Sequence, residues 1–111
     1  MKIKIKISIE HLSILIDFVK RYMDFYNYLD KDEPMQYINL KGFVHFGMKK
    51  IITASENSQP KNKVKTISFD VNQINATYTA MFRKEADLCP LLTALYNDIY
   101  IQTSKQLRLT A

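Results

Sequence analysis

Few side chains in this sequence are of the types that act as nucleophile, base or metal ligand. Cys89 is the only cysteine, and near a helix start its thiolate could act as a nucleophile. The only candidate bases are His11 and His45, and neither belongs to a recognisable cysteine-enzyme motif. We therefore expect Cys89 to be a small buried residue beneath a helix, because free cysteines are usually buried and inert.

The spacing of the remaining residues argues against metal and nucleotide chemistry. No His-x3-His or Cys-x2-Cys pair occurs, so we expect no metal and no cofactor. The only glycines, Gly42 and Gly47, cannot build either of the common glycine-rich phosphate-binding loops. We expect the protein not to be an enzyme, and an enzyme with an unrecognised site ranks last among the functions considered.

Two acidic residues on one predicted helix face, Asp17 and Asp24, are the only paired carboxylates of interest. They lie two helical turns apart, a spacing compatible with the carboxylate pair of an inverting glycosidase. Lys20 and Arg21 stand between them, which favours an ordinary solvated stripe of charge.

Positive charge is in excess, at +5, and it is unevenly distributed. The N-terminal strand and the middle of the chain are basic, whereas the first long helix is acidic. We expect one basic patch on the strand side of the domain, formed by Lys2, Lys4, Lys6, Lys63, Lys65, Arg83 and Lys84. Its face would carry no aromatic side chains for base stacking, so phosphate contact, an acidic protein surface and protection of a sheet edge against aggregation all remain open.

Aromatic residues are concentrated in the predicted first helix. Exposed aromatics could stack on bases, but the acidic charge of this segment would repel phosphates. Packing in the core and at an oligomer interface is favoured, because aromatic residues are enriched at interfaces. The residues that we assign to an oligomer interface are Phe18, Tyr22, Phe25 and Tyr26.

The elements that position these residues begin with a strand and a helix. Residues 2–9 alternate between lysine or serine and isoleucine, which predicts a half-buried strand. Residues 10–29 carry apolar residues at the helical period, with Ser8 as a suitable N-cap. The apolar arc is wider than one sheet can cover, so the helix needs cover on a second side, either from a second copy over Phe18 and Phe25 or from the element inserted after it.

The rest of the chain is less regular. Residues 35–54 fit a helix or a strand, and Pro34 after a run of acids favours the helix, although Gly42 and Gly47 count against it. Residues 55–63 predict a flexible loop. Alternation over residues 67–82 predicts a β-hairpin that turns at Asn72 and Gln73, and Asp87 is suited to cap a last helix. Residues 106–109 alternate as a short final strand would.

These elements predict one α+β domain over residues 1–111, with an antiparallel sheet and helices on one face. Without the inserted element, the order of strand, helix, two strands, helix and final strand is that of a ferredoxin-like fold. The favoured function is a non-catalytic protein-interaction module that forms homo-oligomers. The alternative is a sequence-nonspecific nucleic-acid-binding protein. No apolar run approaches the ~20 residues that a membrane span needs, and the lone cysteine and lysine-interrupted N-terminus predict a cytoplasmic protein.

Overall fold

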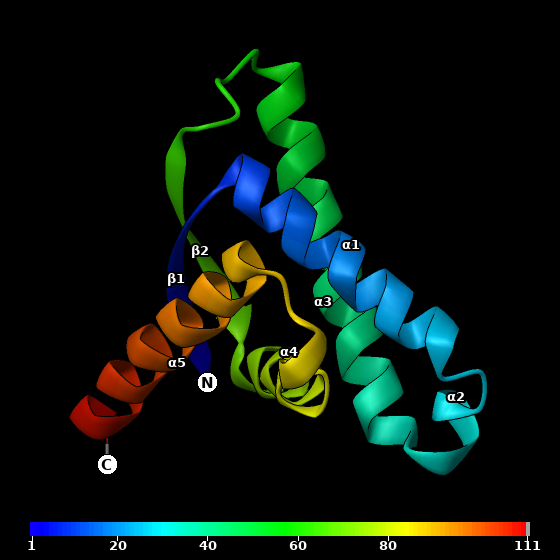
Figure 1. The fold of residues 1–111 in the computed structure, drawn as a ribbon. Coiled ribbons are helices and arrows are strands. Elements are labelled where there is room, and N and C mark those ends of the chain that lie inside the picture. The colour runs from blue at the N-terminus through cyan, green and yellow to red at the C-terminus, as the bar shows by residue number, and fades with distance from the viewer. Residues whose placement is uncertain (111) are drawn as a thin grey trace.

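The computed structural model of the chain describes residues 1–110, with side chains described through residue 108 (Figure 1). It mixes helix and strand, which confirms the α+β class. The elements are β1 (Lys2–Ser8), α1 (Ile9–Phe25), α2 (Leu29–Asp32), α3 (Pro34–Glu56), β2 (Val64–Asp70), α4 (Val71–Arg83), the short 3-10 turn η1 (Glu85–Asp87) and α5 (Pro90–Thr110).

β1 and β2 form a two-stranded antiparallel sheet in which Lys2 lies opposite Asp70 and Ser8 lies opposite Val64. The alternation of β1 has the predicted result, because its isoleucines are buried while Lys2, Lys4 and Lys6 are exposed on the other face. Ile67 and Phe69 of β2 extend the buried face. The sheet therefore has one apolar side and one polar side.

α1 begins where β1 ends, because the Ser8 hydroxyl accepts a hydrogen bond from the His11 N–H at 3.1 Å and caps the helix. α3 packs along α1, so residues 34–56 are the helix that the sequence favoured. Gly47 makes this close approach possible, since a Cβ there would lie 2.6 Å from Cδ1 of Ile16. The second side of α1 is thus covered by the inserted element, and its wide apolar arc gives no reason to expect a second copy over Phe18.

The predicted β-hairpin is wrong, because residues 71–83 form α4. Asp70 ends β2 and caps this helix, its Oδ1 accepting from the Asn72 N–H at 2.9 Å. Two threonine hydroxyls bond back to carbonyls four residues earlier, Thr77 to Gln73 and Thr79 to Asn75, so these β-branched residues are satisfied within a helix. Within residues 1–110 the sheet has two strands, and the ferredoxin-like order is not formed.

The C-terminal predictions also need correction. The last helix begins at Pro90, so Asp87 ends the preceding 3-10 turn and does not cap the helix, and the helix continues through residues 106–109, where a strand was expected. Cys89 precedes this helix and is exposed, so the expected burial is wrong. The segment between α3 and β2 is tied to the start of α1, since Glu10 N–H donates to the Lys61 carbonyl at 2.9 Å. Its flexibility stays a prediction.

The outer edge of β1 is occupied by two glutamines of α5, which lies beside β1 in Figure 1. Gln102 accepts from the Lys6 N–H at 2.8 Å and donates to the Lys6 carbonyl at 3.1 Å. Gln106 makes the same pair of bonds with Lys4, both at 2.7 Å. The backbone groups of Lys4 and Lys6 therefore point away from β2.

This geometry identifies which backbone groups lie on the outer edge of β2. Because successive residues of a strand point their backbone groups to opposite sides, Ile3, Ile5 and Ile7 form the ladder with β2, and the residues opposite Lys4 and Lys6 face outward. Those residues are Ser68 and Thr66. Within the described residues, no backbone or side-chain group hydrogen-bonds to the N–H or C=O of either.

Candidate functional site

The cations predicted to form one basic patch occupy separate places. Lys2, Lys4 and Lys6 form an exposed row on the polar side of the sheet, which we call the lysine face. Lys65 lies opposite the buried Ile7, so it belongs to the other side of the sheet, and Lys63 lies in the preceding loop. The hairpin that would have brought these two beside Arg83 and Lys84 does not form.

The lysine face gains one cation that the sequence did not indicate. Lys105 of α5 lines a shallow groove of about 530 Å³ together with Lys4 and Lys6, and Thr66, Gln102 and Asp98 are among its other lining residues. The groove is thus polar and mainly basic. No local sequence signal places Lys105 there, because its position depends on how α5 lies against β1.

Arg83 is held in a structural contact. Its guanidinium forms two hydrogen bonds with the Glu33 carboxylate, at 2.6 and 2.7 Å, and donates to the Tyr22 hydroxyl at 3.0 Å. This bond to Arg83 lowers the pKa of the Glu33 carboxyl, and the same contacts raise the pKa of Arg83. The cluster joins the end of α4 to α1 and to the start of α3, so the Arg83 side chain has a structural role.

The four residues assigned to an oligomer interface divide into two pairs. Tyr22 is buried at 3% exposure and Phe18 packs partly buried against the core, so neither offers a surface to a partner. Phe25 and Tyr26 are exposed where α1 ends, and Tyr28 follows them in the next turn. We call Phe25, Tyr26 and Tyr28 the aromatic corner.

Lys84 lies against the aromatic corner. Its Nζ lies 3.9 Å from the centroid of the Phe25 ring and 5.4 Å from that of Tyr26, both cation–π distances. The exposed fractions of Phe25 and Tyr28 are 67% and 65%, which is large for side chains of this size. The corner combines apolar rings with a positive charge, and Asp32 and Glu33 line a groove of about 250 Å³ beside it.

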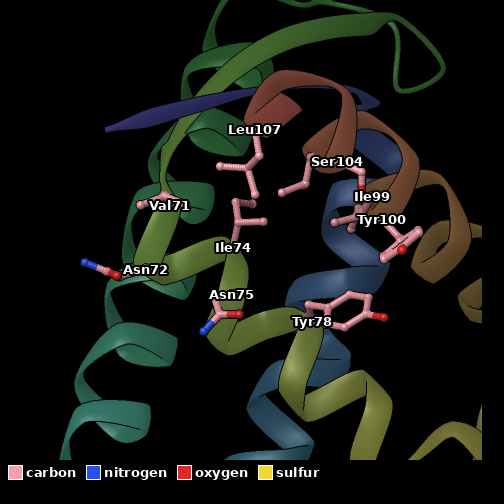
Figure 2. Close-up of a pocket in the computed structure, with 10 residues that line it drawn as sticks. Val71, Asn72, Ile74, Asn75, Tyr78, Ile99, Tyr100, Ser104 and Leu107 are labelled. Atoms are coloured by element: carbon pink, nitrogen blue, oxygen red, sulfur yellow. The ribbon is translucent and has the colours of Figure 1, made fainter. Parts of the chain in front are cut away.

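A third, more apolar groove of about 310 Å³ lies between α4 and α5 (Figure 2). Ile74 and Tyr78 enter it from α4, and Ile99, Tyr100 and Leu107 enter it from α5. None of its lining residues carries a carboxylate, an imidazole, a thiol or an amine. The groove could hold an apolar group, but it provides no general acid or base near neutral pH.

The tyrosines next to this groove are held together. The rings of Tyr78 and Tyr96 stack with centroids 4.8 Å apart, and the Tyr96 hydroxyl bonds to that of Tyr78 at 3.0 Å. Burial, followed by this hydrogen bond, raises the pKa of Tyr96 to about 12. Tyr96 therefore stays protonated at physiological pH and serves as a packing residue.

The residues that could do chemistry do not converge. Within residues 1–110, no group of three or more His, Cys, Asp or Glu side chains could hold a metal ion. His45 is exposed on α3, whereas His11 is half-buried in the first turn of α1. Over the same residues, no helix is both long and apolar enough to span a bilayer.

Comparisons with protein-family models, with curated proteins and with solved structures found no match to this chain.

Proposed function

We propose that the protein is a small non-catalytic protein-interaction module that works as a homo-oligomer. The observation that carries this proposal is the aromatic corner. Exposed aromatic rings clustered on a small protein are typical of interaction surfaces, where tyrosine and phenylalanine are enriched. The rings of Phe25 and Tyr26 are already in mutual contact, with centroids 5.1 Å apart, so a partner would meet a preordered surface.

Site-specific photocrosslinking tests this proposal directly. A photoreactive benzophenone amino acid replaces Tyr28, and the control protein carries it at Ile52, an exposed residue of α3. In cells that make the protein, we expect a covalent adduct from position 28 and none from position 52. Absence of any adduct from position 28, in a folded protein, contradicts the proposal. The mass of the adduct tells a second copy from another protein.

A second candidate is sequence-nonspecific nucleic-acid binding, which the lysine face and Lys105 favour. Lysine is a point charge that contacts phosphates without reading bases, so binding would not depend on sequence. With about four phosphate contacts, log K should fall against log salt with a slope of about −4.

The matched test of this candidate replaces Lys4 and Lys105 together by glutamate and compares the change with Lys20→Glu on α1. We expect the double variant to lose binding to bulk DNA and RNA, and Lys20→Glu to retain it. If the wild-type protein binds neither polymer at about 50 mM salt, where the electrostatic attraction is strong, nucleic-acid binding is excluded.

A further inference from the structure

We propose that the outer edge of β2 is the contact between two copies of this chain. Thr66 and Ser68 of one copy would exchange backbone hydrogen bonds with Ser68 and Thr66 of the other. The pairing would extend the two-stranded sheet to a continuous sheet of β1, β2, β2 and β1. This inference rests on the homo-oligomer of the proposed function and places the contact between copies at β2, which leaves the aromatic corner free for a further contact.

The outer edge of β2 is open within the described residues. The N–H and C=O groups of Thr66 and Ser68 point away from β1, and they have no partner within the described chain. Thr66 is exposed, and Val64 at the start of the strand is 62% exposed. A row of open backbone groups on a regular strand is a template for another strand. The edge therefore offers open hydrogen-bonding groups to a partner strand.

The outer edge of β1 cannot pair with a second copy in the same way. Gln102 and Gln106 already occupy the backbone groups of Lys4 and Lys6. A second copy paired along β1 would also bring two rows of lysines onto neighbouring strands, where like charges destabilise the sheet. Pairing through β2 keeps those rows three strand spacings apart, about 14 Å, which exceeds the Debye length of about 8 Å at physiological salt.

β2 is complementary to a second copy of itself. Full overlap of Val64–Asp70 with a second copy centres the two-fold axis on Ile67. Thr66 then lies opposite Ser68, a cross-strand pair of hydroxyl side chains that is favourable on a sheet surface. Val64 lies opposite Asp70, and Lys65 lies opposite Phe69, so no like charges face each other. Ile67 meets its own counterpart, and the buried face continues across the seam.

This symmetry favours a second copy over an unrelated peptide strand. In that register the same seven residues satisfy both sides of the contact, and every outward backbone group of Thr66 and Ser68 gains a partner. The strand is already ordered in the free chain by its ladder with β1, so pairing costs less conformational entropy than docking a disordered peptide.

A proline scan of the edge tests the interface. Thr66→Pro removes an N–H that bonds nothing within the described chain, and proline is tolerated on edge strands at outward positions. Thr66→Val is the matched control, because it changes the side chain and keeps the N–H. Mass is measured by light scattering over the micromolar range, with circular dichroism to check folding. We expect wild type and Thr66→Val to be dimers and Thr66→Pro to be half their mass.

The other outcomes separate the inference from the proposed function. A dimer that persists in Thr66→Pro overturns the β2 interface and leaves self-association standing. A wild-type monomer overturns both the β2 interface and the homo-oligomer, whereas a crosslink from position 28 to another protein would still support an interaction module. Should Thr66→Pro fail to fold, Ser68→Pro removes the neighbouring outward N–H under the same logic, and retention of the dimer there contradicts the inference equally.

Discussion

The two outer edges of the small sheet differ in their hydrogen-bond partners. The outer edge of β1 is hydrogen-bonded by side-chain amides of α5, whereas the outward backbone groups of Thr66 and Ser68 in β2 have no hydrogen-bond partner within the described residues. The helical spacing explains how α5 can do this. Residues four apart on a helix rise by about 6 Å, close to the roughly 6.8 Å between alternate residues of a strand. Gln102 and Gln106 thus imitate a third strand, and the contrast shows that α5 covers the edge of β1 while the edge of β2 stays open within the described residues.

Proline placed at neighbouring positions of β2 should give the largest effect. Ile67→Pro removes a ladder N–H and a buried side chain, so we expect it to lower the free energy of unfolding by about 3 kcal/mol or more. Thr66→Pro should cost the dilute monomer no more than about 1 kcal/mol, because its N–H points outward. Urea denaturation of both variants measures the difference, and equal losses would show that the assigned ladder is wrong.

Removing the glutamines should uncover the edge of β1. In the variant with Gln102→Leu and Gln106→Leu, the backbone groups of Lys4 and Lys6 lose their protein partners. Four partly exposed hydrogen bonds, each worth roughly 0.5 kcal/mol net, predict a loss of about 2 kcal/mol by urea denaturation. Asn97→Leu, an exposed substitution on the same helix, should stay within about 0.5 kcal/mol. A double variant as stable as this control would mean that the amides do not support β1.

The sequence predicted the parts of this arrangement that depend on local pattern. The alternation of Lys4 and Ile5 and the helical period around Leu12 identified β1 and α1. The interior glycines, counted against α3, in fact allow close packing, because Gly47 lies against Ile16. The error at α4 arose because Ile74 and Ala80 fit both a strand and a helix, while the capping role of Asp70 was missed.

The difference between the covered edge of β1 and the open edge of β2 could not be predicted from the sequence. Gln102 and Gln106 carry no signal of their target, because nothing local places α5 beside β1. The open edge of β2 follows only once residues 71–83 are known to be a helix, since the predicted hairpin would have paired that edge. For the same reason Lys65 and Arg83 were joined to a patch that the fold does not assemble.

The ion pair between Arg83 and Glu33 involves neither sheet edge, and its removal should have a smaller effect on the free energy of unfolding. Arg83 lowers the pKa of Glu33 in the folded protein, so the pair stabilises the fold above the carboxyl's unfolded pKa of about 4.3. That contribution is lost as the pH falls through the lower folded pKa. Glu33→Gln should cost about 1 kcal/mol at neutral pH, the upper end for a partly exposed pair, and progressively less in acid. Denaturation at several pH values measures this, and a constant difference would contradict it.

Hydrogen–deuterium exchange resolved to single amides compares the two edges in the unmodified protein. We predict slow exchange of the Lys4 and Lys6 amides at every protein concentration, because α5 accepts from both. The Thr66 and Ser68 amides should exchange quickly in dilute protein and slow by about tenfold or more as the dimer forms. Fast exchange of Thr66 and Ser68 in a sample whose measured mass is that of a dimer would contradict the β2 interface.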